Sequence, residues 1–145
     1  MLKSYCFAAA ILALAAMPAI ADNDCGPAPI GPAIPAASDL SGKTIEASRA
    51  EVLAAYHQVK AYQGALQPFR ACLKTQSDAN KAALLEAQGK ADKDKIASVQ
   101  QSMEDLQKIY DGTVDTETQI ANDFNALHMA DCVNDTDPKI CPKKQ

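Results

Sequence analysis

VLAAYHQVKAYQGALQPFRACL, residues 52–73, places apolar side chains at alternating intervals of three and four positions. Because an α-helix has about 3.6 residues per turn, side chains at this spacing lie on one side of a helix. The regular alternation of three and four is the heptad repeat of a coiled coil. The segment therefore predicts a long helix with one apolar stripe, the first stripe, made of Val52, Ala55, Val59, Tyr62, Leu66, Phe69 and Leu73.

The start of this helix is predicted at Ser48, because Ser48-Arg49-Ala50-Glu51 has the form of a capping box. Pro68 interrupts the helix by removing a backbone donor and pressing on the carbonyl of Gly64. Phe69 and Leu73 nevertheless stay in phase with the stripe. We expect a kink at Pro68 and not an end of the helix.

A second stripe follows a turn predicted at Gly89 and the charged run Lys90–Lys95, which reads as a solvated turn. Asp111-Gly112 and the threonines after it break helices locally, and Thr116 with Gln119 has the spacing of a new cap. The stripe keeps its phase across them, so we expect one weakened but continuous helix. The second stripe consists of Ile96, Val99, Met103, Leu106, Tyr110, Thr113, Glu117, Ile120, Phe124 and Leu127.

The two stripes predict an all-α fold, and the leading architecture is an antiparallel, coiled-coil-like helical hairpin. Its helices span roughly 49–88 and 94–131, each about 60 Å long. A three-helix bundle, with breaks near Gln76–Asn80 and Asp111–Asp115, remains the alternative. The expected organisation is a cleaved signal peptide at 1–21, a proline-rich arm at 22–47, the hairpin at 48–132 and a disulfide-closed tail at 133–145.

The first residues read as a secretory signal peptide. Lys3 supplies a positive charge, Phe7–Met17 is an apolar run, and Ala19-Ile20-Ala21 resembles a cleavage site. Cleavage there leaves 124 of the 145 residues, starting at Asp22. The predicted location is periplasmic or secreted, which is an oxidising environment.

Charge excludes some partners. The chain has 14 Lys and Arg against 18 Asp and Glu, a net charge of −4, and loss of Lys3 with the signal takes it to −5. An acidic chain is a poor ligand for nucleic acid or an anionic membrane. Cys25 follows Asp22-Asn23-Asp24 and not the small apolar residues that precede a lipidated cysteine, so we expect no membrane anchor.

The arm contains four prolines between Pro27 and Pro35, which predict an extended chain close to polyproline II. Three interpretations are open. The arm is a flexible lead-in, or Cys25 holds it along the helices, or it is a proline-rich ligand for another protein.

Four cysteines remain after Cys6 is lost with the signal, and they allow three pairings. In a continuous hairpin, Cys72 and Cys132 lie about 40 Å apart along the axis, too far for a disulfide. That architecture predicts Cys25–Cys72 and Cys132–Cys141. In the three-helix alternative, Cys72 pairs with Cys132 and Cys25 with Cys141.

No motif points to catalysis. The chain has no G-x-S-x-G, P-loop, G-x-G-x-x-G, H-E-x-x-H or C-x-x-C sequence, so we expect no enzyme, no cofactor and no built metal site. His57 falls on the outer face of its helix and His128 on the flank of the second stripe. With Glu51 and Asp131 nearby, a weak surface metal site is conceivable; the acidic residues at 131–137 lack EF-hand spacing and indicate a helix end and turns.

The large side chains of the stripes carry the functional hypothesis. If a stripe is incompletely covered within one chain, its aromatic residues form a groove for a protein partner or a second copy. The leading function is protein–protein interaction in the periplasm or cell envelope, and the alternative is a small-molecule or metal-binding module. The predicted interaction residues are Tyr62, Leu66, Phe69, Tyr110 and Phe124.

Phe69–Leu73, after a tyrosine-containing helix, and Ile120–Leu127 carry a resemblance. These segments are similar to a diffuse set of small, uncharacterised secreted proteobacterial proteins with a proline-rich start, a helical hairpin and few cysteines. The resemblance implies export and a helical fold. It implies no activity and transfers no functional residue.

Overall fold

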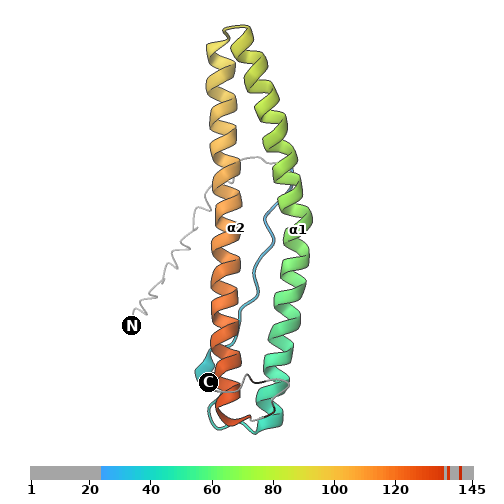
Figure 1. The fold of residues 1–145 in the computed structure, drawn as a ribbon, viewed down its shortest axis with the longest axis vertical. Helices are drawn as coiled ribbons and strands as arrows, with labels where there is room; N and C mark the ends of the chain where they lie inside the picture. Colours follow the sequence, from blue (N-terminus) through green and yellow to red (C-terminus); the bar gives the residue numbers. More distant parts are fainter. Residues whose placement is uncertain (1–23, 136, 138–140, 142–145) are drawn as a thin grey trace, which may run out of the picture.

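The computed structural model describes residues 24–135, 137 and 141, which form a hairpin of two long helices (Figure 1). The 3-10 helix η1 spans Ala37–Leu40, α1 spans Ile45–Gly89 and α2 spans Lys93–Asn134. The described residues contain no strand. The all-α antiparallel hairpin predicted from the two stripes is confirmed; the predicted signal peptide, residues 1–21, lies outside the described residues.

The predicted N-cap of α1 is wrong by four residues. Thr44, and not Ser48, is the N-cap, and its side chain accepts a hydrogen bond from the Ala47 amide at 3.3 Å. Ser48 lies buried in the first turn, where its own amide donates to the Thr44 carbonyl. Glu51 pairs with Lys43 and does not close a capping box. The arm was predicted to end at 47 and the hairpin to begin at 48, whereas α1 begins at Ile45.

Both helices are continuous across the predicted weak points, which excludes the three-helix alternative. α1 contains Pro68 and bends in its middle part in Figure 1, as a proline inside a helix predicts. In α2 the threonine hydroxyls donate to carbonyls of the preceding turn, Thr113 to Tyr110 and Thr116 to Gly112. These hydroxyls therefore bond within a continuous helix and do not cap a new one.

The two stripes meet along the hairpin. In the first stripe every residue is buried except Val59, which is partly buried; in the second, alternate members Val99, Leu106, Thr113, Ile120 and Leu127 are buried. Three hydrophobic clusters follow one another from the base of the hairpin to its middle. The clusters end at Leu73 and Leu106, so the part near the tip rests on smaller contacts such as Ala87 and Val99.

The arm lies lengthwise along one side of the helix pair (Figure 1). Cys25 is bonded to Cys72. Ile34 packs against two of the clusters, and Gly31 sits directly against Ile120 and Thr116. Of the three interpretations, the arm held along the helices by Cys25 is the one observed.

At the base of the hairpin, the second disulfide joins Cys132 of α2 to Cys141. The two bonds are the pairing predicted for a continuous hairpin. α2 extends to Asn134, two residues beyond the predicted end of the hairpin at 132.

No helix among the described residues has the length and apolar character needed to cross a membrane.

Candidate functional site

One side of the helix pair is covered by the arm, and the other presents a regular row of large side chains. Residues 56, 63 and 70 of α1, and 110, 117 and 124 of α2, are each seven positions apart, so each set forms one row along its helix. The arm instead contacts the α2 side that carries Ile109, Gly112 and Thr116. We call the uncovered surface the open face, defined by Tyr56, Gln63, Arg70, Lys74, Met103, Tyr110, Glu117, Phe124 and His128.

Arg70 organises the middle of the open face. Its Nε donates to Thr113 Oγ1 at 2.9 Å and its Nη1 to Glu117 Oε2 at 2.7 Å. Gln63 donates to the other oxygen of the Glu117 carboxylate at 3.1 Å. The guanidinium also lies 5.5 Å from the centre of the Tyr110 ring. These contacts hold both helices and fix the orientation of Tyr110.

A cleft of about 480 Å³ opens next to this network, on the side toward the tip. Residues of α1 and α2 alone line it, with Leu73, Met103 and Leu106 supplying apolar surface and Arg70, Lys74, Ser77, Gln107 and Tyr110 supplying polar groups. Because its lining is both apolar and polar, the cleft suits a ligand that has an apolar body and a polar or anionic end.

Aromatic rings continue the open face toward the base. The Tyr56 and Phe124 ring centres are 6.2 Å apart, and Phe124 stacks on His128 at 6.1 Å. His57 touches Tyr56 edge-on and is itself exposed, as its predicted outer position requires. The rings form a half-exposed patch that joins the two helices.

The predicted interaction residues divide into two groups. Tyr62, Leu66 and Phe69 are buried among the clusters of the hairpin, so they are occupied within the chain. Tyr110 is 41% exposed and Phe124 is partly buried, and both belong to the open face. Sequence reasoning did not single out Tyr56 and Arg70, although their spacing of fourteen residues beside the first stripe was a usable signal.

A group of charged residues lies at the base of the hairpin. Arg49 donates from two nitrogens to Asp135 Oδ2, and the Asp137 amide donates to Asp135 Oδ1 at 2.9 Å. The Asp137 amide and then Arg49 hold the pKa of Asp135 below its ordinary value. Asp131 is only 3% exposed, and its carboxylate has no hydrogen-bond partner among the described residues. Burial, and then the charge of Asp135, raise the pKa of Asp131.

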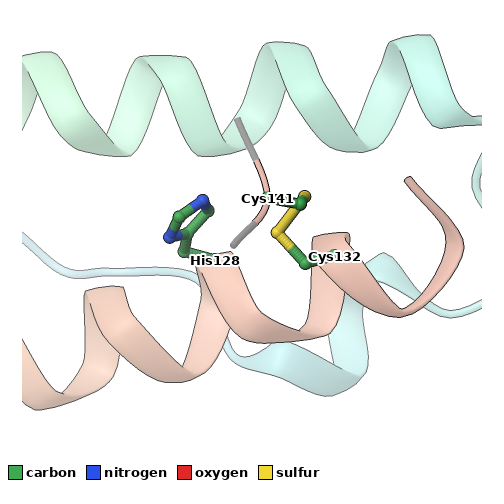
Figure 2. Close-up of side chains that lie close together, drawn as sticks. All are labelled: His128, Cys132 and Cys141. Carbon is green, nitrogen blue, oxygen red and sulfur yellow. A yellow bond between two sulfur atoms is a disulfide. The ribbon is translucent and has the colours of Figure 1, made fainter. Parts of the chain in front are cut away.

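His128 lies beside the basal disulfide, as Figure 2 shows. A ring nitrogen of His128 and the sulfurs of Cys132 and Cys141 all lie within 4.8 Å of one another. The surface site conceived from the sequence used His57, His128, Glu51 and Asp131; the structure groups His128 with the two cysteines instead. Glu51 forms an ion pair with Lys43. The sequence predicted the Cys132–Cys141 bond and places His128 four residues before Cys132, but it did not show that the His128 side chain lies beside that bond.

Comparisons of the chain with models of known protein families, with curated proteins and with solved structures find no match.

Proposed function

We propose that this chain is an exported helical protein, periplasmic or secreted, that acts by binding another protein through the open face. One observation carries the proposal: on the side that the arm does not cover, two rows of large side chains at heptad spacing include the partly exposed aromatic residues Tyr56, Tyr110 and Phe124. Tyrosine and arginine, together with tryptophan, are enriched at the energetic centres of protein interfaces.

The occupant that fits this surface is a helical segment of the partner. Rows that repeat every seven residues on two neighbouring helices form a groove for a third helix. Leu73, Met103 and Leu106 in the cleft would receive its apolar side chains, and Lys74, which is 77% exposed and paired with Asp78, would also face acidic ones. Arg70 and Glu117 neutralise each other, so the middle of the groove recognises polar groups without a net charge.

Export is supported by the leader-like first residues and by the two disulfides, because such bonds persist outside the reducing cytosol. Amino-terminal sequencing of the protein recovered from its native cells tests this. The expected first residue is Asp22, with no free thiol in the mature chain. Recovery of chains that retain Met1 and carry free thiols would contradict export.

Site-specific crosslinking tests the binding surface. A photo-crosslinking residue replaces Tyr110 on the open face, and in the matched control it replaces Asn122, an exposed position of α2 outside the open face. A crosslinked protein is expected from position 110 and not from position 122. Tyr110→Ala should then weaken the affinity of the identified partner at least about tenfold, as for a central interface tyrosine, while Asn122→Ala leaves it unchanged.

The same groove can accept a second copy of this chain, and sedimentation of the purified protein distinguishes that case. Association that depends on concentration and is lost in Tyr110→Ala identifies a homodimer. A strict monomer that gives no crosslink from position 110 in its native envelope contradicts the proposal.

A small-molecule function is the second candidate, and the cleft beside Arg70 favours it. A ligand with an apolar body and an anionic end should raise the melting temperature of the wild-type chain. The increase should disappear in Met103→Lys, which puts a charge on the apolar lining. A screen of such ligands with no shift for any of them would remove this candidate.

A further inference from the structure

Three potential metal ligands converge at the base of the hairpin. His128 and Cys132 lie one turn apart on α2, and Cys141 reaches them from the tail, as Figure 2 shows. The three ligand atoms lie within 4.8 Å of one another. Cys141 is buried, and His128 and Cys132 are partly buried, so solvent can reach part of the group.

This distance suits a tetrahedral ion. Zinc bonds of about 2.3 Å to sulfur and about 2.0 Å to nitrogen place ligand atoms about 3.5–3.8 Å apart. The 4.8 Å limit therefore leaves the His128 nitrogen within reach of such a separation from the sulfurs, while the two sulfurs, bonded to each other here, must move apart after reduction to bind one ion. Among the described residues, this is the one group of three His, Cys, Asp or Glu side chains whose ligand atoms lie so close together. The Cys25–Cys72 disulfide belongs to no such group.

While the disulfide is intact, its sulfurs are not thiolates and do not bind zinc well. A dithiol reductant changes this by exchange: it transfers two electrons and two protons to the bond, is itself oxidised to a disulfide, and leaves two thiols at Cys132 and Cys141. A divalent ion then displaces the two thiol protons and binds both thiolates.

A buried carboxylate lies next to the group. Asp131 precedes Cys132, and its carboxylate is buried without a hydrogen-bond partner among the described residues. A buried carboxylate of this kind is stabilised when positive charge is brought near it.

We propose that the base of this hairpin is a reduction-dependent metal site, in which Cys132, Cys141 and His128 bind Zn²⁺ after the disulfide is reduced. The fourth position of the tetrahedron is left to water. Cys141 is then joined to Cys132 by the covalent bond in the oxidised chain and through the ion in the reduced chain.

Cobalt titration tests the site, because Co²⁺ adopts the same geometry and thiolate ligation gives it charge-transfer absorption. The whole chain is reduced with a phosphine, which binds these ions weakly, and is titrated with Co²⁺ and then with Zn²⁺. We expect one Co²⁺ per chain with thiolate charge transfer, displaced by one Zn²⁺, and no such signal from the oxidised chain.

Matched variants assign the ligands. Cys25→Ser/Cys72→Ser retains the site and should bind as the reduced wild type does, whereas Cys132→Ser/Cys141→Ser should show no thiolate charge transfer. His128→Ala should weaken Co²⁺ binding at least about tenfold, as expected for loss of one ligand, and His57→Ala should not. Circular dichroism of each reduced variant confirms that the helices remain.

Three results would overturn the proposal. One is equal Co²⁺ binding by the oxidised and reduced wild type, which marks adventitious surface binding. Another is unchanged binding in Cys132→Ser/Cys141→Ser. The third is equal loss of affinity in His57→Ala and His128→Ala while both variants remain helical.

Discussion

Gly31 brings the backbone of the arm directly against side chains of α2. A Cβ atom at this position would lie 2.6 Å from Ile120 Cδ1 and 3.1 Å from Thr116 Cγ2. Ile120 is buried, so its side chain has little room to move away. Gly31→Ala should therefore destabilise the protein by about 1–3 kcal/mol, the usual cost of overpacking. Urea unfolding measures the change.

Gly112→Ala is the matched control for this prediction. Gly112 lies inside α2, and a Cβ atom there would meet nothing within 4 Å. Alanine favours the helix, so this variant should gain about 0.5–1 kcal/mol. Equal effects of the two substitutions would show that Gly31 does not sit against α2 in solution.

Asp135 makes the stability of the base depend on pH. Its folded pKa lies below the ordinary value because the Asp137 amide and Arg49 stabilise the charged form. The stabilisation is complete above the unfolded pKa, about 3.9, and is lost as the pH falls through the lower folded pKa. Asp135→Asn should thus be less stable than wild type at pH 7, and the difference should shrink as the pH falls below about 4.

Thermal unfolding between pH 2 and pH 7 measures this difference. Asp115→Asn removes an exposed carboxylate of α2 and serves as the control for general loss of charge. Parallel curves for Asp135→Asn and wild type across the whole range would contradict the assigned role of Asp135.

At the scale of the elements, the connection between the helices has an alanine where glycine is preferred. The Asp92 amide donates to the Ala87 carbonyl and the Ala91 amide to the Gln88 carbonyl, which is the Schellman pattern that ends a helix. Ala91 occupies its left-handed position with φ of 54°, while Gly89 is the last helical residue. Ala91→Gly should therefore stabilise the protein by about 1 kcal/mol.

An alanine in the helix interior provides the comparison for that variant. Ala79 is exposed within α1, and Ala79→Gly should cost about 1 kcal/mol. Chemical unfolding of both variants measures the two effects, which are expected to have opposite signs. A loss of stability in Ala91→Gly equal to that in Ala79→Gly would show that the left-handed turn is not formed.

The helices were predictable because their signal is local. Apolar residues from Val52 to Leu73 and from Ile96 to Leu127 repeat with the period of the element they form, so the hairpin follows from the sequence. The exact ends of the helices do not follow from the sequence, because Thr44 and Ser48 are both residue types that cap helices well. In the structure Thr44 is the cap and Ser48 is buried in the first turn. The turn shows the same limit: Gly89 marks the region, but the left-handed residue is Ala91.

The candidate site was less predictable because it depends on which side of the pair the arm covers. The sequence identifies Tyr110 and Phe124 as large stripe residues, but it does not show that the arm leaves them accessible while Tyr62 and Phe69 are buried. Only contacts between distant residues, such as Gly31 with Ile120, fix that side. For the basal group, the Cys132–Cys141 bond was predicted, and only the position of the His128 side chain beside it was not.

At the scale of the whole molecule, the arm takes the place of a third helix. Two helices alone bury one stripe each and leave both flanks of the contact exposed to water. The arm covers one flank with Ile34 and the backbone around Gly31, so the residues beneath it complete their burial. The open face is the flank that remains, and this asymmetry is what distinguishes a binding side from a structural side.

The two disulfides should contribute unequally to this arrangement. Cys25–Cys72 joins residues 47 apart and fixes the arm, whereas Cys132–Cys141 joins residues only 9 apart. Loop-closure entropy assigns about 4 kcal/mol to the longer loop and about 2.6 kcal/mol to the shorter. Cys25→Ser/Cys72→Ser should therefore lower the free energy of unfolding more than Cys132→Ser/Cys141→Ser does, and it alone should speed amide hydrogen exchange at Ile120. Urea unfolding and exchange measured on both variants check this, and equal losses with protected amides throughout would show that the arm stays in place without its bond to Cys72.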